Sequence, residues 1–298
     1  MIGVFDSGFG GLTVLRALHD ALPDRRFVFL GDHCSGPYGN RAPDEILALT
    51  RRATGTLFDL GCRLVVLACN TAASTSLRRL QQDWLPNAYP DHRILGVVVP
   101  MVEAVTGMPW MADLPARPAE GRPQTVAILA TRQTVLSNAY PVEIGKRAPW
   151  VKVVQQACPR LVDLIEGGAG RDAMAAMVRR YVDDLMEKLE GRAPDVVMLG
   201  CTHYPLIQDL FAAALPTGAA ILSQPDLSAR SLAAYLDRHP DLDQPDSAAP
   251  QRFYTTGDPD AVSRLGSVFF GRTVRFESIS TARRIDGADP QVASLSMA

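Results

Sequence analysis

Short apolar runs rich in β-branched residues alternate along this chain with longer amphipathic stretches. Such alternation predicts α/β architecture with parallel strands. The run Leu64-Val65-Val66-Leu67 is continuously apolar, as expected of a central parallel strand that helices cover on both faces. Strands are predicted over residues 2–5, 27–30, 64–68, 94–98, 126–129, 152–155, 196–200, 220–222, 252–255 and 274–277. Amphipathic helices are predicted over residues 12–21, 44–60, 72–85, 172–189 and 227–236.

Three apolar strands recur in the same order in two halves of the chain. Residues 64–71 (LVVLACNT) match residues 196–203 (VVMLGCTH), since each has an apolar strand, a small residue, a cysteine and two polar residues. Residues 2–7 similarly match residues 126–131, and a second strand follows each at a similar interval. Ligands of open α/β sheets bind beyond the carboxyl ends of the strands, where all of these polar residues lie. We therefore expect two related α/β halves that face each other across one cleft.

The composition is that of an ordinary globular protein, with 47% hydrophobic and 21% charged residues in a chain of 298 and a formal net charge of -2. This charge balance predicts neither nucleic acid nor an acidic membrane surface as a partner. No apolar run approaches the roughly 18 residues that span a bilayer, and the N-terminus lacks the basic region of a signal peptide. The five cysteines are an odd number without zinc-like pairing, which favours free thiols and a cytoplasmic location.

Lysine is rare in this chain. Of the 30 basic residues only Lys146, Lys152 and Lys188 are lysine, and none of them lies in a motif. Pyridoxal phosphate must be held by a lysine Schiff base. We therefore expect an activity without a pyridoxal cofactor.

Two cysteines, Cys69 and Cys201, follow predicted strands in the repeat and precede polar residues that begin a helix. A buried structural role is the commonest fate of a lone free cysteine. Here Thr71 can cap the helix, whose free N–H groups accept an anion and lower the pKa of a thiol. Cys201 has the same setting, with His203 two residues later. The pairing of these two settings favours a functional role for both thiols.

Two thiols on opposite sides of a cleft could form a disulfide, bind a metal, attack as nucleophiles or exchange protons. Zinc requires further ligands, and only His203 is near in sequence. Nucleophilic hydrolysis needs one thiol and one base, which leaves the second cysteine unexplained. Racemisation uses both thiols, because a proton leaves one face of a carbon atom and another returns to the opposite face. Proton exchange is therefore the favoured hypothesis.

Polar residues at other strand ends fit supporting roles. Asp6 precedes a glycine-rich turn at residues 8–11, where an acidic group argues against a phosphate site and could relay a proton from Cys69. The backbone at Gly39 is either a simple turn or a site for a substrate carboxylate. Glu166 has the sequence setting of a solvated helix end. The remaining cysteines are predicted to be structural: Cys34, Cys62 and Cys158.

These motifs resemble those of glutamate racemases, in the aspartate/glutamate racemase superfamily. DSGFGGL, CNTA and GCTHYPL are specific in combination, although each alone would be a weaker signal. The matching segments run in the family's order and cover nearly the whole chain: FDSGFGGLTVL (5–15), GDHCSGPYG (31–39), LACNTA (67–72), ATRQTVLSNAY (130–140), ACPRLVDLIEGG (157–168), LGCTHYPLI (199–207) and YTTGD (254–258).

The resemblance implies a fold of two pseudo-symmetric parallel-sheet α/β domains, with the active site in the cleft between them. The first domain would comprise residues 1–96 and 208–280, and the second, residues 97–207, would be inserted in it. Residues 286–298 are expected to form a flexible tail, and the proline- and glycine-rich residues 106–123 a surface loop.

The resemblance also implies the activity and its residues. Cys69 would exchange the proton of D-glutamate with help from Asp6, and Cys201 that of L-glutamate with help from His203 and Glu166. The activity would need no metal or other cofactor, and the expected partners are glutamate and a second copy of the chain in a homodimer. The product would supply D-glutamate for peptidoglycan. The implied substrate contacts are Asp6, Ser7, Pro37, Tyr38, Gly39, Asn70, Thr71, Thr131, Thr134, Thr202 and His203.

Some positions depart from the family pattern. Residues 33–36 lack the arginine often found there, Val99 stands where a charged residue is common, and the loop at 106–123 is longer than usual. The alternatives left open are a racemase of aspartate or a related amino acid, a one-cysteine isomerase or decarboxylase, a non-catalytic amino-acid-binding protein and a cysteine hydrolase.

Overall fold

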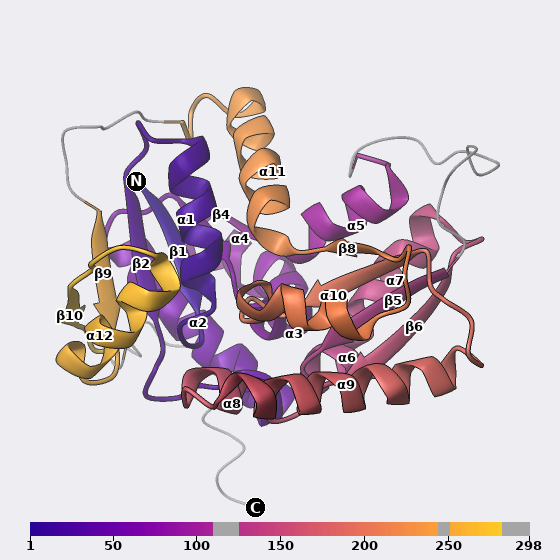
Figure 1. The fold of residues 1–298 in the computed structure, drawn as a ribbon. Helices are drawn as coiled ribbons and strands as arrows, with labels where there is room; N and C mark the ends of the chain where they lie inside the picture. The colour runs from indigo at the N-terminus through magenta and orange to yellow at the C-terminus, as the bar shows by residue number, and fades with distance from the viewer. Residues whose placement is uncertain (110–124, 244–250, 282–298) are drawn as a thin grey trace, which may run out of the picture.

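Two parallel β-sheets lie side by side, each with helices packed against it (Figure 1). The computed structural model describes residues 1–109, 125–243 and 251–281. The first sheet has the order β10 (Phe276–Ser278), β9 (Arg252–Thr255), β2 (Phe27–Gly31), β1 (Ile2–Asp6), β3 (Leu64–Leu67) and β4 (Arg93–Gly96). The second has the order β6 (Lys152–Ala157), β5 (Thr125–Ala130), β7 (Val196–Gly200) and β8 (Ala220–Leu222). The α/β class and the parallel sheets expected from the sequence are confirmed. The expected tail and residues 110–123 of the expected loop lie outside the described residues.

The two sheets repeat one topology. The order β2-β1-β3-β4 in the first sheet corresponds to β6-β5-β7-β8 in the second. The central strands are paired in the same way, with Phe5 beside Leu67 in one sheet and Ala130 beside Gly200 in the other. The three strands matched in the sequence are therefore equivalent in the fold. The structure adds a fourth equivalent pair, β4 and β8.

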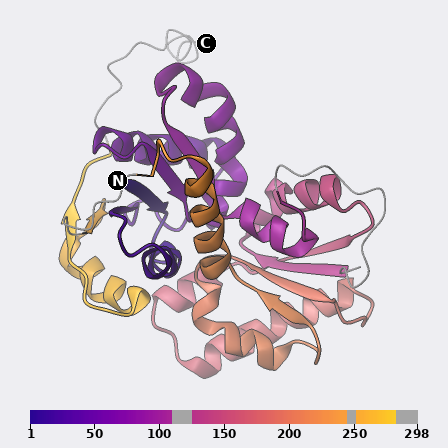
Figure 2. The same ribbon diagram turned by 90° about the horizontal axis from the view of Figure 1, so that it is seen from above.

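Helices cover the sheets and join them. α1 packs against α11 and α12, while α11 also packs against α5 and lies between the two sheets in Figure 2. In the second half, α9 packs against α10 and β6. The helices are α1 (Gly11–Ala21), α2 (Pro43–Asp59), α3 (Asn70–Arg79), α4 (Leu85–Ala88), α5 (Val98–Thr106), α6 (Arg132–Ser137), α7 (Ala139–Arg147), α8 (Leu161–Glu166), α9 (Arg171–Lys188), α10 (Gln208–Ala214), α11 (Gln224–Arg238) and α12 (Pro259–Phe270).

The second sheet extends beyond the boundary expected at residues 207 and 208. β8 pairs with β7, and α10 packs against α9, so residues 208–222 lie with the second sheet rather than the first. A short strand can bury its backbone groups only on a neighbouring strand, and β7 offers the free edge. The chain returns to the first half along α11.

The core explains why these runs form strands. Every residue of β1 and β2 is buried, as are the four residues of β3. Because helices cover both faces of a parallel sheet, its central strands have no polar face and read as continuous apolar runs. An aromatic group of Phe29, Phe253 and Phe276, with ring centroids 5.6 to 6.5 Å apart, fills the layer beside β9 and β10.

Two glycines inside helices predict opposite effects of the same substitution. Gly145 in α7 is exposed, and a Cβ there would meet no atom within 4 Å. Gly145→Ala should therefore raise the free energy of unfolding by about 0.5–1 kcal/mol, because alanine has the higher helix propensity. At Gly266 in α12 a Cβ would lie 2.7 Å from a ring carbon of the buried Phe276. Gly266→Ala should lower the same free energy by about 1–3 kcal/mol. Urea denaturation measures both effects, and stabilisation at both positions would contradict this packing.

Candidate active site

One cavity lies where the carboxyl ends of the two sheets face each other. Both Cys69, just after β3, and Cys201, just after β7, line it. The other predicted site residues in its wall are Ser7, Pro37, Tyr38, Gly39, Asn70, Thr71, Thr131, Thr202 and His203. The structure thus brings together residues that are far apart in the sequence, such as Ser7 and His203, as expected for the strand ends of two facing sheets.

Three predicted site residues lie behind this wall and act on it through neighbours. Asp6 and Thr134 are fully buried, and Glu166 contacts the ring of His203. Sequence reasoning missed other residues of the wall: Asn40, Arg132, Cys158, Pro159, Arg160, Val162 and Asp163. The sequence did contain a signal for Cys158, because this residue directly follows β6, the strand equivalent to β2, and polar residues at such strand ends line the cavity.

Cys69 occupies the N-cap position of α3. Its Sγ accepts a hydrogen bond from the backbone N–H of Ala72 at 3.4 Å, so the cysteine itself caps the helix for which Thr71 was the expected cap. The Ser7 hydroxyl lies 3.3 Å from the same sulfur. Burial, followed by the negative charge of Asp6, raises the pKa of the Cys69 thiol to about 12, although both hydrogen bonds act in the opposite direction. Helix capping alone therefore leaves this thiol neutral at pH 7.

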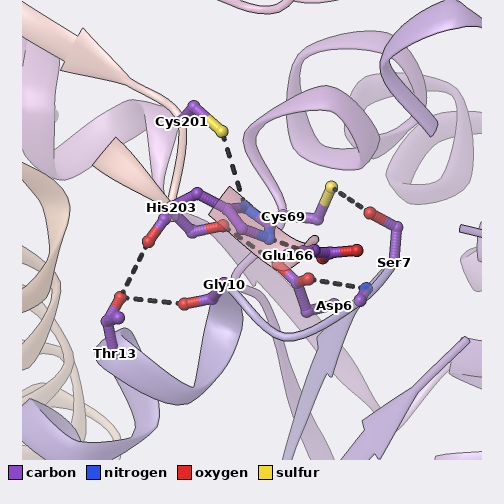
Figure 3. A network of polar contacts seen from close by, with 10 residues as sticks. Asp6, Ser7, Gly10, Thr13, Cys69, Glu166, Cys201 and His203 are labelled. Carbon is purple, nitrogen blue, oxygen red and sulfur yellow. Dashed lines mark hydrogen bonds and ion pairs between the residues drawn. The ribbon is translucent and has the colours of Figure 1, made fainter. Parts of the chain in front are cut away.

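Cys201 has a different polar environment. Its Sγ lies 3.7 Å from Nδ1 of His203, and Nε2 of the same ring lies 2.7 Å from Oε1 of Glu166 (Figure 3). Burial disfavours the imidazolium, but the hydrogen bonds and charges of Cys201 and Glu166 outweigh it and raise the pKa of His203 well above 6.5. Burial likewise disfavours the carboxylate, yet the hydrogen bond from His203 lowers the pKa of Glu166. A protonated imidazole therefore lies between the sulfur of Cys201 and the carboxylate of Glu166.

Asp6 connects the two halves through its carboxylate. Oδ1 accepts a hydrogen bond from the backbone N–H of Gly8 at 2.8 Å, and Oδ2 accepts one from the Thr202 hydroxyl at 3.3 Å. Complete burial raises the pKa of Asp6, partly offset by the charge of His203 and the bond from Gly8. The hydroxyl that contacts Cys69 belongs to the next residue, Ser7. Asp6 thus acts on Cys69 through its charge, while its hydrogen bonds are with Gly8 and Thr202.

The glycine-rich turn after β1 is a docking surface between the two halves. A Cβ at Gly10 would lie 2.2 Å from Oγ1 of Thr202 and 2.5 Å from Nδ1 of His203. Only glycine allows that approach. The hydroxyl of Thr13 lies near the same loop, 2.8 Å from the carbonyl of Gly10 and 3.1 Å from that of Thr202 (Figure 3). Close contact between halves is therefore the structural reason for glycine in this turn.

Hydroxyl groups link the walls of the cavity on its other side. Oγ1 of Thr71 lies 2.9 Å from Oγ1 of Thr131, which caps α6, and Thr134 bonds to both. The phenol of the buried Tyr38 donates a 2.6 Å hydrogen bond to Asp32. These bonds fix the wall, and Thr71 and Thr131 themselves line the cavity.

Within the described parts of the chain, no three His, Cys, Asp or Glu side chains gather so that they could hold a metal ion. No helix in those parts is long and apolar enough to cross a membrane.

Comparisons with known proteins identify the family. No family model matches the chain. It is 45% identical over 281 residues, 93% of this chain and 99% of the relative, to a glutamate racemase of Phenylobacterium zucineum. Among solved structures, it resembles the glutamate racemase of Francisella tularensis in complex with D-glutamate, with a TM-score of 0.79 and 25% identity over 95% of this chain and 98% of that chain. It also resembles the glutamate racemase of Thermus thermophilus in complex with β-chloro-D-alanine, with a TM-score of 0.75 and 32% identity over 94% and 96% of the two chains.

The fold and the sequence similarity are those of an amino-acid isomerase. Identity of this extent over nearly the full length also defines the family. The chain belongs to the glutamate racemase family.

The raised pKa of Cys69 predicts a steep pH dependence of its reactivity. The thiolate is the nucleophile, so alkylation of Cys69 by iodoacetamide should increase about tenfold per pH unit from about pH 7 to 10. Ser7→Ala removes a bond that lowers this pKa and should slow alkylation about three- to tenfold at a given pH. Peptide mass spectrometry of the ligand-free protein measures both effects, with the exposed Cys34 as the internal reference. Alkylation of Cys69 as fast as that of Cys34 at pH 8 would contradict the neutral thiol.

Proposed function

We propose that this protein interconverts L- and D-glutamate through Cys69 and Cys201, one on each side of the substrate Cα, without a cofactor. The observation that carries the proposal is that both thiols line one cavity from the ends of equivalent strands, β3 and β7. Proton removal from one face and return to the other requires two acid–base groups, one ionised and one protonated. A pair of thiols related by the repeat supplies that geometry.

The reaction from L-glutamate begins with Cys201 as thiolate and Cys69 as thiol. The Cys201 thiolate takes the Cα proton, and the Cys69 thiol donates its proton to the opposite face. The product is D-glutamate, with Cys201 now protonated and Cys69 ionised. The reverse reaction uses the same groups in exchanged roles.

The imidazolium of His203 stabilises the Cys201 thiolate at 3.7 Å, and Glu166 keeps the ring protonated through its own carboxylate. On the other side, Ser7 and the N–H of Ala72 stabilise the Cys69 thiolate. The Asp6 carboxylate opposes that thiolate, so it favours proton transfer to Cys69, which is the first step from D-glutamate, and disfavours proton donation by Cys69. The two thiols thus have equivalent roles, while different neighbours stabilise their thiolate forms.

A thiolate is a weak base for an amino-acid Cα, because the carbanion formed is very unstable. Hydrogen-bond donors around the substrate carboxylate in a water-poor cavity offset this cost. Donors in the wall include the amide of Asn70 and the hydroxyls of Thr71 and Thr131. We expect the two halves to close over the substrate during turnover.

The remaining expectations from the sequence belong to this proposal. The substrate contacts would be the eleven residues named in the resemblance, with Asp6 and Thr134 acting from behind the wall. D-glutamate made in the cytoplasm would supply peptidoglycan synthesis, and the chain would work as a homodimer.

Deuterium incorporation at Cα of each glutamate enantiomer in D₂O tests the two-thiol mechanism. Wild type should exchange and interconvert both enantiomers without added cofactor. Cys69→Ser and Cys201→Ser should each lose racemisation at least about 10²-fold, because one acid–base group is missing. Residual exchange without inversion should favour L-glutamate in Cys69→Ser and D-glutamate in Cys201→Ser.

The exposed thiol offers a matched control, and Cys34→Ser should retain wild-type rates. Binding of glutamate by wild type without any exchange would overturn the proposed activity. The same preference for residual exchange in both cysteine variants would overturn the two-sided mechanism alone.

The contacts that join Cys201, His203 and Glu166 predict a change in the substrate deuterium isotope effect when Glu166 is replaced. Glu166→Gln removes the carboxylate that keeps His203 protonated, so proton transfer at Cys201 should slow about 10- to 100-fold. The fall in kcat/KM must be equal for both enantiomers, since they are equally stable. The substrate deuterium isotope effect should rise for L-glutamate and fall for D-glutamate, because the Cys201 step becomes more rate-limiting. Glu187→Gln, an exposed carboxylate on α9, is the control, and equal isotope effects in both directions would contradict the assignment.

A further inference from the structure

The active-site cavity shares part of its wall with a second cavity, of about 470 Å³. This second cavity, which we call the arginine pocket, lies between the end of β6, the first residue of α6 and one side of α9. Arg132, Pro159 and Arg160 line both cavities, whereas Arg180 on α9 lines the arginine pocket only. Neither of the two thiols lines this pocket, so its ligand would be a neighbour of the substrate.

Three arginines line the arginine pocket from three different elements. Arg132 begins α6, Arg160 directly precedes α8, and Arg180 lies in α9. Among the described residues, none of these guanidinium groups has a hydrogen-bond or ion-pair partner. Asp184, the carboxylate in the lining, is one helical turn after Arg180 but forms no ion pair with it, and the lining side chains have a net charge of +2. Like charges gathered at one cavity repel each other, so an anion bound there would stabilise them.

A buried amide oxygen in the wall of the arginine pocket also lacks a partner. Gln156, in β6, lines the pocket and is only 6% exposed. Its Nε2 group donates a 2.9 Å hydrogen bond to the backbone carbonyl of Ala157, and this bond fixes the orientation of the amide because a carbonyl oxygen only accepts. Its Oε1 is buried and has no partner in the described parts of the chain. A buried acceptor without a partner is costly, so this oxygen is available to a hydrogen-bond donor of a ligand.

Charge and size define the chemical class of this ligand. A phosphate monoester carries about 1.5 to 2 negative charges at pH 7, which matches the net charge of the lining better than the single charge of a carboxylate does. Guanidinium groups also bind phosphate oxygens in a bidentate manner. A phosphate group is far smaller than the pocket, whose lining also includes Pro159, Met177 and Tyr181. These side chains suit the organic part of a phosphorylated molecule.

We propose that the arginine pocket binds a small phosphorylated organic molecule, whose phosphate group lies among the three arginines and whose hydrogen-bond donor reaches Gln156. Binding at this site does not depend on the proposed function, but its effect on racemisation does. Glutamate is itself an anion, and Arg132 and Arg160 also line the cavity proposed to hold it. A phosphate group that neutralises them lowers the positive potential at the substrate.

Isothermal titration calorimetry of the full chain with inorganic pyrophosphate, at constant ionic strength, measures binding at the arginine pocket. Arg180→Gln removes a guanidinium that lines this pocket only, so the dissociation constant should rise about five- to tenfold. Arg179→Gln removes the same charge from the adjacent exposed position, which does not line the pocket, and is the matched control. Its dissociation constant should stay within about twofold of wild type. Equal weakening in both variants, or no binding to wild type, would overturn the proposed site.

Two further variants distinguish a binding role from damage to the fold. Asp184→Asn removes the negative charge of the lining, so pyrophosphate should bind about two- to fivefold more tightly, a gain that structural damage does not produce. Arg160 has a left-handed backbone conformation with φ 68°, which glycine adopts more readily than arginine. Arg160→Gly should therefore unfold at the wild-type temperature or above it, yet bind pyrophosphate about five- to tenfold more weakly. Weaker binding by Asp184→Asn, or unchanged binding by Arg160→Gly, would contradict the proposal.

Racemisation assays test the effect on the neighbouring cavity. Saturating pyrophosphate should raise the KM of wild type for both enantiomers about two- to fivefold and leave kcat within about twofold. Arg180→Gln should have the KM of wild type without pyrophosphate and need a five- to tenfold higher pyrophosphate concentration for the same effect (about the loss of affinity). Competition for the active-site cavity itself predicts equal sensitivity of the two proteins, and that outcome would overturn the proposal.

The same measurements separate this inference from the proposed function. A wild type that binds pyrophosphate with the expected dependence on Arg180 but does not racemise glutamate means that the proposed function fails and the site remains. An active wild type whose pyrophosphate binding does not depend on Arg180 means that only this inference fails.

Discussion

The polar contacts of the cavity depend on how closely the turn after β1 approaches the loop after β7. At Gly10 a single added carbon would meet Thr202 and His203 at 2.2 and 2.5 Å. Because that carbon is absent, Asp6 reaches the Thr202 hydroxyl, and Thr13 reaches the backbone of the same loop. This contact brings the strand ends of the two sheets to one buried cavity. Gly10 therefore allows the close approach of the two repeated halves at this point.

The repeat makes the two halves alike in strand order, while their charges differ. Burial and the nearby carboxylate of Asp6 keep the Cys69 thiol neutral, although a hydroxyl and a helix N–H act in the opposite direction. Cys201 has an imidazole held in its charged form by Glu166. A symmetric pair of neighbours would give both thiols the same protonation state at rest. In the proposed exchange the two thiols take opposite protonation states in turn, and they do so beside unequal neighbours within a symmetric frame.

Burial raises the cost of every charge in this site, and the structure offsets each one locally. Glu166 is paired with His203, and the carboxylate of Asp6 accepts a backbone and a hydroxyl hydrogen bond. The amide of Asn70 is the exception, since its NH₂ group is buried without a partner in the described residues. Among the described residues that line the active-site cavity, Asn70 alone has a buried side-chain polar atom without a partner, which leaves that NH₂ group available to a ligand.

The sequence by itself determined the α/β class, most of the sheet strands and the two thiols, because buried parallel strands are continuous apolar runs and functional residues follow their carboxyl ends. It could not assign β8 to the second sheet, since three apolar residues carry no information about which free edge they will meet. Nor did it predict α6, α7, α8 and α12, because their amphipathic patterns are short or are interrupted by glycine and proline. Glu166, Ser7 and Gln224 acquired their contacts only in the folded chain, where His203, Cys69 and Leu199 lie beside them. The local sequence pattern indicates which side chains are buried, whereas the packing of the two halves determines which distant residues form hydrogen bonds with each other.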